Sequence, residues 1–149
     1  MKIRIADTQD ELRRCFPVMV QLRPHLSESE FIFRALRQAA QHGYIVAYVE
    51  DEGSVRAVVG FRVTECLSTG RFLYVDDLVA DEAHRSRGFG ETLFDWIVNR
   101  ARDEGCEEIT LDSGVQRHAA HRFYFRKRMR VSGHHFSLKA RDAEIGVAG

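Results

Sequence analysis

A glycine-rich turn between an extended apolar run and an amphipathic segment most constrains what this chain can fold into. Residues 72–80 are rich in strand-forming side chains, and residues 89–101 place apolar side chains at helical spacing. Between them stands the hexapeptide Arg85-Ser86-Arg87-Gly88-Phe89-Gly90. This order predicts a strand, a short turn that carries the two glycines, and a helix that opens at Glu91.

A helix start of this kind suits an anion. Its first backbone N–H groups have no partner within the helix, and the helix dipole is positive there. Glycine lets a ligand approach the backbone closely, and Arg85 and Arg87 add positive charge. We call residues Arg85 to Glu91 the anion-binding turn and predict that it takes a phosphate group. The alternative is a glycine-rich helix start without a ligand.

Two better-known phosphate motifs fit less well. A P-loop ends in Lys followed by Ser or Thr, and no Lys follows Gly90. A dinucleotide-binding turn needs a third glycine, and this chain has Leu93 in that place. Neither motif is therefore preferred.

The same segment resembles a known family. Arg-x-x-Gly-x-Gly after a strand is similar to the acyl-CoA pyrophosphate loop of the GNAT family of N-acetyltransferases. Downstream, Ala120-His121-Arg122-Phe123-Tyr124 resembles that family's Ala-x-x-Phe-Tyr helix. The resemblance runs from about Ile3 to Leu138, and two ordered matches are far more specific than one. The chain departs from the pattern at Arg128, where the family has the glycine of a left-handed helix stop.

The element order β-α-α-β-β-β-α-β-α-β predicts an α/β domain with helices on both faces of the sheet. The resemblance implies a mixed, centrally splayed β-sheet, with the cofactor between the strand before the anion-binding turn and the strand around Leu111. We expect one N-acetyltransferase domain over residues 1–149, with residues 141–149 as a flexible tail. The expected strands are 1–6, 44–49, 55–64, 72–80, 108–112 and 131–140, and the expected helices are 8–24, kinked or split at Pro17, then 27–41, 91–104 and 116–128.

Charge and cysteine content restrict the setting. The 149 residues hold 22 basic and 22 acidic side chains, so the net charge is zero and a general nucleic-acid binder is not indicated. Cys15, Cys66 and Cys106 are widely spaced and odd in number, which favours a reducing compartment. The N-terminus is too short and too mixed for a signal peptide, and no apolar run approaches membrane-spanning length. We expect a cytoplasmic protein without nucleic-acid or membrane partners.

The resemblance implies an acetyl-CoA-dependent N-acetyltransferase that acts by direct attack of a primary amine in a ternary complex. A small-molecule amine is the preferred acceptor, because Asp76 and Asp77 would attract a cation. A lysine side chain is also a cation, so a protein lysine or N-terminal acetyltransferase stays open, as does a non-catalytic CoA-binding sensor or interaction module. No metal is expected, since His134 and His135 are adjacent rather than at ligand spacing. The chain could form a homodimer.

Two residues are candidates for the chemistry. By resemblance, Tyr124 points at the acyl-CoA sulfur; a phenol titrates at about 10, so it can donate a proton to the leaving thiolate at neutral pH. The string Asp76-Asp77-Leu78-Val79 is similar to the Glu-Asp-Phe-Phe of diamine acetyltransferases, whose first acid is the base, and this maps to Asp76. The alternatives are a core tyrosine and an ion pair between Asp76 and a neighbouring arginine. Because adjacent strand residues face opposite sides, only one of the two aspartates should face the substrate.

The remaining candidates bind cofactor or substrate. In the family the strand before the turn bulges, which implies that the backbone amides of Leu78, Val79 and Ala80 bind pantetheine and the thioester oxygen. The resemblance also places Arg23 and His25, in the loop between the first two helices, at the border of the acceptor pocket. Plain solvent exposure is the alternative for these two. Asp77 is a further substrate-binding candidate.

Overall fold

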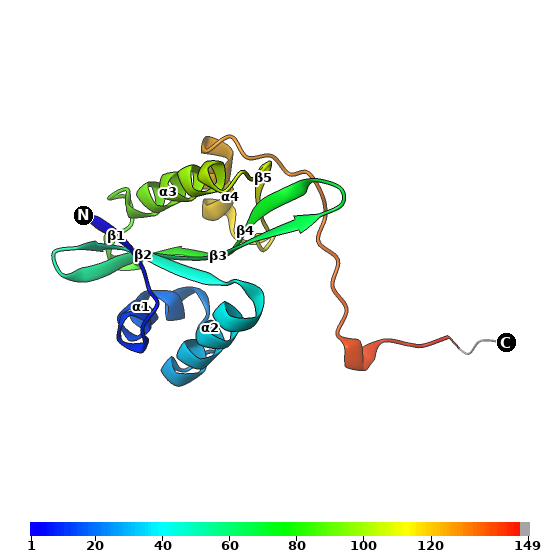
Figure 1. Cartoon of the computed structure of the whole chain (residues 1–149), viewed down its shortest axis with the longest axis horizontal. Coiled ribbons are helices and arrows are strands. Elements are labelled where there is room, and N and C mark those ends of the chain that lie inside the picture. Colours follow the sequence, from blue (N-terminus) through cyan, green and yellow to red (C-terminus); the bar gives the residue numbers. More distant parts are fainter. Residues whose placement is uncertain (147–149) are drawn as a thin grey trace. The chain divides into compact units, whose positions relative to one another are not determined.

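A mixed five-stranded sheet forms the centre of the computed structural model, which describes residues 1–146 (Figure 1). The neighbours β1 to β4 are antiparallel, and β5 is parallel to β4, which confirms the predicted mixed sheet. In sheet order the strands are β1 (Lys2–Ile5), β2 (Ile45–Asp51), β3 (Ser54–Cys66), β4 (Gly70–Ala80) and β5 (Glu108–Leu111).

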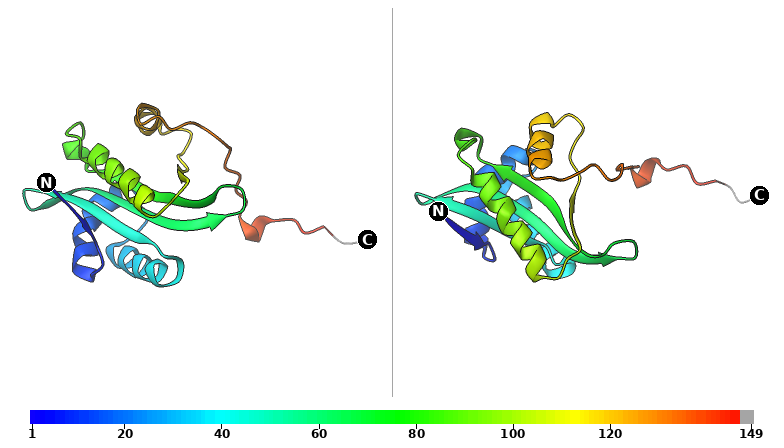
Figure 2. Two further views of the ribbon diagram at one scale, coloured as in Figure 1. Left: turned by 45° about the horizontal axis from the view of Figure 1, so that its top comes forward. Right: turned by 90° about the horizontal axis from the view of Figure 1, so that it is seen from above.

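Helices cover both faces of this sheet, as predicted. α1 (Gln9–Leu22) and α2 (Glu28–His42) lie on one face, and α3 (Phe89–Asp103) lies on the other (Figure 1 and Figure 2). Alternation along β2 divides the apolar side chains between the faces, so Tyr48 is buried with α1 and α2 whereas Val49 is buried with α3. The sheet therefore separates two cores, which we call the α1–α2 core and the α3 core.

The starts of α1 and α2 have the sequence of capping boxes, in which Thr8 or Ser27 stands three residues before a glutamate. Thr8 accepts a hydrogen bond from the backbone N–H of Glu11, and Ser27 accepts one from that of Glu30. Gly43 ends α2 in the left-handed conformation, with φ of +69°. These local signals set the helix boundaries on the face that later carries the pocket.

Pro17 lies inside α1, where the sequence predicted a kink or a split, and the structure has one helix from Gln9 to Leu22. Cys15 before the proline and Val18 and Met19 after it are buried in the α1–α2 core. Packing on both sides of the proline therefore holds the two halves together, although the proline supplies no N–H for the helical ladder.

β4 extends well past the end of β5. The two strands pair only between Phe72 and Val75 on β4 and Glu108–Leu111 on β5. From Asp76 to Ala80, β4 has β3 on one side, and within the described residues no strand lies against its other edge. The strands thus part after Val75, which is the predicted splay of the sheet.

The chain divides into two compact units, Met1–Leu111 and Asp112 onward. The second unit contains α4 (His118–Arg126), shorter than the predicted helix, and a 3₁₀ helix (Ala140–Asp142). Among the helices of the described chain, none is both long enough and apolar enough to cross a membrane.

The strand predicted over residues 131–140 is wrong. Residues 131–139 have no regular structure. Phe136 and Leu138, which would share one face of a strand, are exposed. A strand needs a neighbour for its backbone N–H and C=O groups, and no strand of residues 1–146 pairs with this segment. Of the predicted tail, residues 147–149 lie outside the described part of the chain.

Candidate active site

A β-bulge in β4 shapes the centre of the candidate site. Gly60 of β3 pairs with Asp77, and the next residue of β3, Phe61, pairs with Val75. Asp76 is therefore an extra residue of β4 without a partner on β3.

The bulge reverses the direction of the side chains that follow it. Val75, before the bulge, is buried in the α3 core. After it, Leu78 and Ala80 pack against the α3 core, whereas Val79 is buried in the α1–α2 core. In an unbroken strand Asp77 and Val79 would share the face of Val75. The bulge therefore turns Asp77 away from the apolar α3 core and toward α1 and α2.

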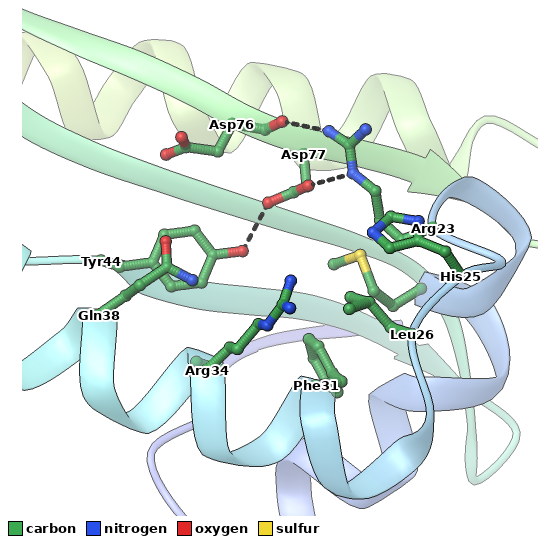
Figure 3. Close-up of a pocket in the computed structure, with 11 residues that line it drawn as sticks. Arg23, His25, Leu26, Phe31, Arg34, Gln38, Tyr44, Asp76 and Asp77 are labelled. Carbon is green, nitrogen blue, oxygen red and sulfur yellow. Dashed lines mark hydrogen bonds and ion pairs between the residues drawn. The ribbon is translucent and has the colours of Figure 1, made fainter. Parts of the chain in front are cut away.

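A pocket of about 280 Å³ opens beside the bulge, on the side of α1 and α2 (Figure 3). The predicted substrate residues Arg23, His25 and Asp77 line it together with Asp76. Both aspartates reach the pocket, although strand alternation predicted only one, because the bulge interrupts that alternation. The fold thus gathers candidates from the α1–α2 loop and from β4 in one place.

Two pocket residues hold the carboxylate of Asp77. Arg23 donates from Nε to Asp77 Oδ1 at 2.9 Å, and the hydroxyl of Tyr44 donates to Oδ2 at 2.6 Å (Figure 3). Arg23 also donates from Nη2 to the backbone carbonyl of Asp76 at 3.0 Å, so one guanidinium fixes both residues of the bulge. Burial, followed by the charge of Asp77, raises the pKa of Tyr44 well above its usual value, so Tyr44 remains a donor.

Asp76 is bound by a different arginine. Arg62 of β3 donates from Nε and Nη2 to the two carboxylate oxygens at 3.0 and 2.9 Å. This is the arginine ion pair considered as the alternative to a catalytic role. Burial nevertheless raises the pKa of Asp76 above its usual value, against the lowering effect of Arg62. A raised pKa makes a carboxylate a stronger base, so the ion pair and a role in proton transfer are compatible.

Gly60 makes room for Tyr44. A Cβ atom at position 60 would overlap the Tyr44 hydroxyl and ring. Gly60 is also the residue that pairs with Asp77 beside the bulge. The absence of a side chain there therefore lets the Tyr44 ring lie across β3 and reach Asp77.

The anion-binding turn is exposed and has the backbone shape of a ligand-binding helix start. Ser86 and Gly88 adopt left-handed conformations, with φ of +69° and +82°, and Gly88 is the N-cap of α3 without a side-chain cap. A Cβ atom at Gly88 would project into open space, whereas Phe89 is buried and anchors the helix. Residues 85–88 and Glu91 are exposed. Open space beside the backbone at a helix N-terminus fits the close approach of a pyrophosphate.

A hydrogen-bond network ties the start of this turn to α1. Gln21 donates to Asp81 Oδ1 at 3.1 Å and accepts from the backbone N–H of Glu82 at 2.9 Å. His84 Nδ1 lies 3.0 Å from Asp81 Oδ2. The turn therefore leaves β4 from a fixed point.

The backbone of Leu78, Val79 and Ala80 borders the open edge of β4. In an antiparallel pair, successive residues direct their N–H groups alternately toward the partner strand and away from it. Beyond Val75, the groups that point away from β3 meet no strand of the described chain. This edge is therefore suited to hydrogen bonds with a ligand.

Tyr124 lies in α4, in the second unit, with its ring 5.6 Å from that of Phe123. Burial raises the pKa of Tyr124 above its usual value, and the nearby Arg117 opposes this effect. The phenol therefore stays protonated at neutral pH and can act as a proton donor.

α4 ends in the left-handed stop that the departure at Arg128 had placed in question. The N–H of Arg128 donates to the carbonyl of Phe125 at 2.9 Å, and that of Met129 donates to the carbonyl of Tyr124 at 3.0 Å. Arg128 itself has φ of +67°. This is a Schellman motif with arginine in the position that glycine usually takes.

Sequence reasoning missed Tyr44, Gly60, Arg62 and Arg34 as site residues. Each is ordinary in its local sequence, since Tyr44, Gly60 and Arg62 belong to strand-like runs and Arg34 to a predicted helix. Tyr44 and Arg34 line the pocket itself. Gly60 and Arg62 meet the two aspartates only through the pairing of β3 with the bulged β4. An arginine and a glycine on the strand opposite two acids is a weak signal that could have been used.

Comparisons with known proteins bear on the family and the fold of this chain. The model of the Acetyltransferase (GNAT) family matches residues 5–129. The "uncharacterized N-acetyltransferase YhdJ" of Bacillus subtilis is 30% identical over 117 residues, which cover 78% of this chain and 82% of that protein. Glucosamine 6-phosphate N-acetyltransferase 1 of Oryza sativa subsp. japonica is 31% identical over 118 residues, covering 74% and 72%. The structure of aminoglycoside N-acetyltransferase AAC(6')-Iy in complex with CoA matches with a TM-score of 0.80 at 13% identity, over 94% of each chain.

Proposed function

This chain belongs to the GNAT family of acetyltransferases and is an N-acetyltransferase, and we propose that it transfers the acetyl group of acetyl-CoA to the primary amine of a small molecule. The amine attacks directly in a ternary complex. The observation that carries this proposal is the pocket beside the β4 bulge, which adjoins a strand edge suited to a ligand. A pocket of about 280 Å³ matches a small acceptor, as do the amines in the names of the glucosamine 6-phosphate and aminoglycoside enzymes.

Acetyl-CoA supplies the acetyl group as an activated thioester. The anion-binding turn would hold the pyrophosphate through its backbone N–H groups, with Arg85 and Arg87 beside it. Those backbone amides along Leu78, Val79 and Ala80 that point away from β3 would hold the pantetheine and the thioester oxygen, where negative charge develops. The exposure of the turn and the open edge of β4 support this assignment.

Asp76 is the proposed proton acceptor for the amine, which must be neutral to attack. Its raised pKa makes it a stronger base than an exposed aspartate, and Arg62 fixes its position. Asp77, Arg23 and His25 are the proposed substrate-binding residues, and all three line the pocket.

Tyr124 is the proposed proton donor to the leaving thiolate, which its raised pKa supports. The mechanism needs no metal, and the three free cysteines suit a cytoplasmic setting.

The proposal is tested by CoA release with a panel of amines, amino acids and peptides. At least one small amine should give turnover, and Tyr124→Phe should lower kcat by about 10²–10⁴-fold with acetyl-CoA affinity unchanged. Tight CoA binding without turnover on any amine would favour a sensor or interaction module. Turnover on peptides alone would favour a protein acetyltransferase.

Cofactor binding is tested separately by calorimetry. Gly88→Val should weaken acetyl-CoA binding, because a side chain there fills the open space beside the turn. Gly105→Val is the matched control, since Gly105 also has positive φ and open space but follows the other end of α3. Equal affinities for the two variants would remove the turn from the cofactor site.

A further inference from the structure

We infer that the acceptor carries a negatively charged group in addition to its amine, and that Arg34 binds this group. This inference rests on the proposed function and names the substrate class of that pocket. The predicted preference for a plain cation assumed that Asp76 and Asp77 present free negative charge. The structure shows instead that both carboxylates already have cationic partners.

The pairing of the two aspartates leaves little attraction for a cation. Both oxygens of Asp76 accept hydrogen bonds from Arg62, and the two oxygens of Asp77 accept from Arg23 and Tyr44. The exposed fractions of the Asp76 and Asp77 side chains are only 21% and 14%. A purely cationic acceptor would have to displace one of these arginines.

Arg34 supplies a positive charge that no acid of the described chain neutralises. It extends from α2 into the pocket toward the bulge (Figure 3). The acid one turn earlier on α2, Glu30, accepts a hydrogen bond from Ser27 in the capping box rather than from Arg34. Arg23, Arg34 and Arg62 stand against Asp76 and Asp77, so one positive charge remains at the site.

Arginine suits such a role because its planar guanidinium can donate two parallel hydrogen bonds to a carboxylate or a phosphate. His25 and Gln38 line the same pocket and offer further polar groups. Met19, Leu26 and Phe31 form an apolar wall. An acceptor with its anion at Arg34 and its amine at the bulge would span the pocket from α2 to β4.

The size of the pocket suits a small acceptor. A volume of about 280 Å³ is at the low end for ligand pockets. The class that fits is a primary amine bearing a carboxylate or a phosphate a few bonds away. These two anions share the same recognition by arginine, so the experiment includes both.

The test compares matched acceptors that differ only in the anion. The pairs are 2-aminoethyl phosphate with ethanolamine, β-alanine with propylamine, and glucosamine 6-phosphate with glucosamine; 1,4-diaminobutane is the cationic comparison. In at least one pair the anionic member should have a kcat/KM about tenfold or more above its partner. The pair that shows the preference distinguishes phosphate from carboxylate.

Arg34→Gln should then raise KM for the anionic acceptor about 10- to 100-fold with little change in kcat, and leave KM for the partner without the anion unaffected. Arg34→Lys should recover part of the loss. Arg37→Gln is the control, because Arg37 is exposed on the same helix and does not line the pocket. Circular dichroism and melting temperature confirm that each variant is folded.

Two results would overturn the inference. One is a higher kcat/KM for 1,4-diaminobutane than for every anionic acceptor; the other is an equal effect of Arg34→Gln on the acceptors with the anion and on their partners without it. Calorimetric binding of the three anionic acceptors to the parent, Arg34→Gln and Arg37→Gln does not depend on turnover. If no amine gives CoA release, the proposed function fails. Calorimetry then still tests whether Arg34 binds the anion: weaker binding by Arg34→Gln than by Arg37→Gln supports this role. No binding of any anionic acceptor, or equal binding by the two variants, would reject the inference.

Discussion

Arg128 occupies the left-handed position that ends α4, and the helix stop forms around it. For an L-residue other than glycine this conformation costs about 1 kcal/mol or more. The two hydrogen bonds of the Schellman motif fix the position of the Tyr124 backbone, because its carbonyl is one of the acceptors. The arginine is therefore tolerated at a point that ends the helix of the proposed proton donor.

Replacing Arg128 with glycine should stabilise the protein by about 1 kcal/mol, since glycine adopts positive φ without strain. For a chain of this length the melting temperature should rise by about 2–4 °C. Amide hydrogen exchange at Met129 should slow in parallel. Arg130→Gly is the control: Arg130 is not among the residues with positive φ, so this change should be neutral or destabilising. Equal effects of the two changes would show that strain at Arg128 is negligible.

Asp76→Asn should lose most activity at low pH and recover part of it as pH rises. A base is needed most where the amine is protonated, and hydroxide or buffer can replace it where the amine is already neutral. The measurement is kcat/KM against pH with an acceptor identified by the panel. Asp77→Asn changes the same pocket while keeping the proposed base, so it should raise KM and keep the pH profile of the parent. A profile for Asp76→Asn parallel to that of the parent would transfer the role to Asp77.

At the level of helices and strands, the elements that could be predicted are those specified by local signals. α1 and α2 start at the capping boxes of Thr8 and Ser27, and α3 follows a strict apolar periodicity. The bulge at Asp76 could not be derived from the residues, because it depends on how β4 pairs with β3 and not on β4 alone. The strand expected at residues 131–140 failed for the related reason that periodicity does not supply a pairing partner.

The candidate site follows the same division. Arg23, His25, Asp76 and Asp77 were predicted, and they share one pocket. Their hydrogen-bond partners Tyr44 and Arg62 were not, because Tyr44 lies directly before β2 and Arg62 lies in β3, and both meet the aspartates only through sheet register. The candidate residues could be predicted from the sequence, whereas the structure was needed to show which charged side chains of the pocket are paired.

Tyr44, the residue before β2, packs across β3 at Gly60, where no side chain is present. Gly60→Ala should displace the Tyr44 ring, destabilise the protein by about 1–3 kcal/mol and break the hydrogen bond to Asp77. Urea unfolding measures the loss, and KM for the acceptor should rise with it. Tyr44→Phe is the comparison, because it keeps the ring and removes the bond to a charged group, worth about 1.5–3 kcal/mol. If Gly60→Ala binds the acceptor like the parent, the placement of Tyr44 is not needed for the pocket.

For the molecule as a whole, the α1–α2 core contains ionisable groups that favour the folded state only while they are protonated. Burial raises the pKa of Cys15 to about 12 from 9.0, and burial together with the hydrogen bond to Glu11 raises that of Tyr48 to about 12 from 10.0. The unfolded chain therefore releases these protons at a lower pH than the folded chain. Their contribution to stability is complete below about pH 9 and is lost as pH rises toward 12.

The free energy of unfolding, measured by urea titration, should accordingly fall between pH 9 and pH 12. Cys15→Ala should make this fall less steep, although it lowers stability at neutral pH by leaving a small cavity. Cys66→Ala is the control, since the pKa of Cys66 is lowered rather than raised and its side chain is not in the core. An unchanged slope in Cys15→Ala would show that this thiol does not couple folding to pH.

The bulge at Asp76 acts on β4 as a one-letter insertion acts on a reading frame. Upstream, odd-numbered positions face the α3 core; downstream, even-numbered positions do. Deleting one residue at the bulge would therefore exchange the surroundings of Leu78, Val79 and Ala80 at once, whereas a deletion of equal length in the β3–β4 turn would leave them in phase. The two aspartates lie at the junction of the two phases of the strand.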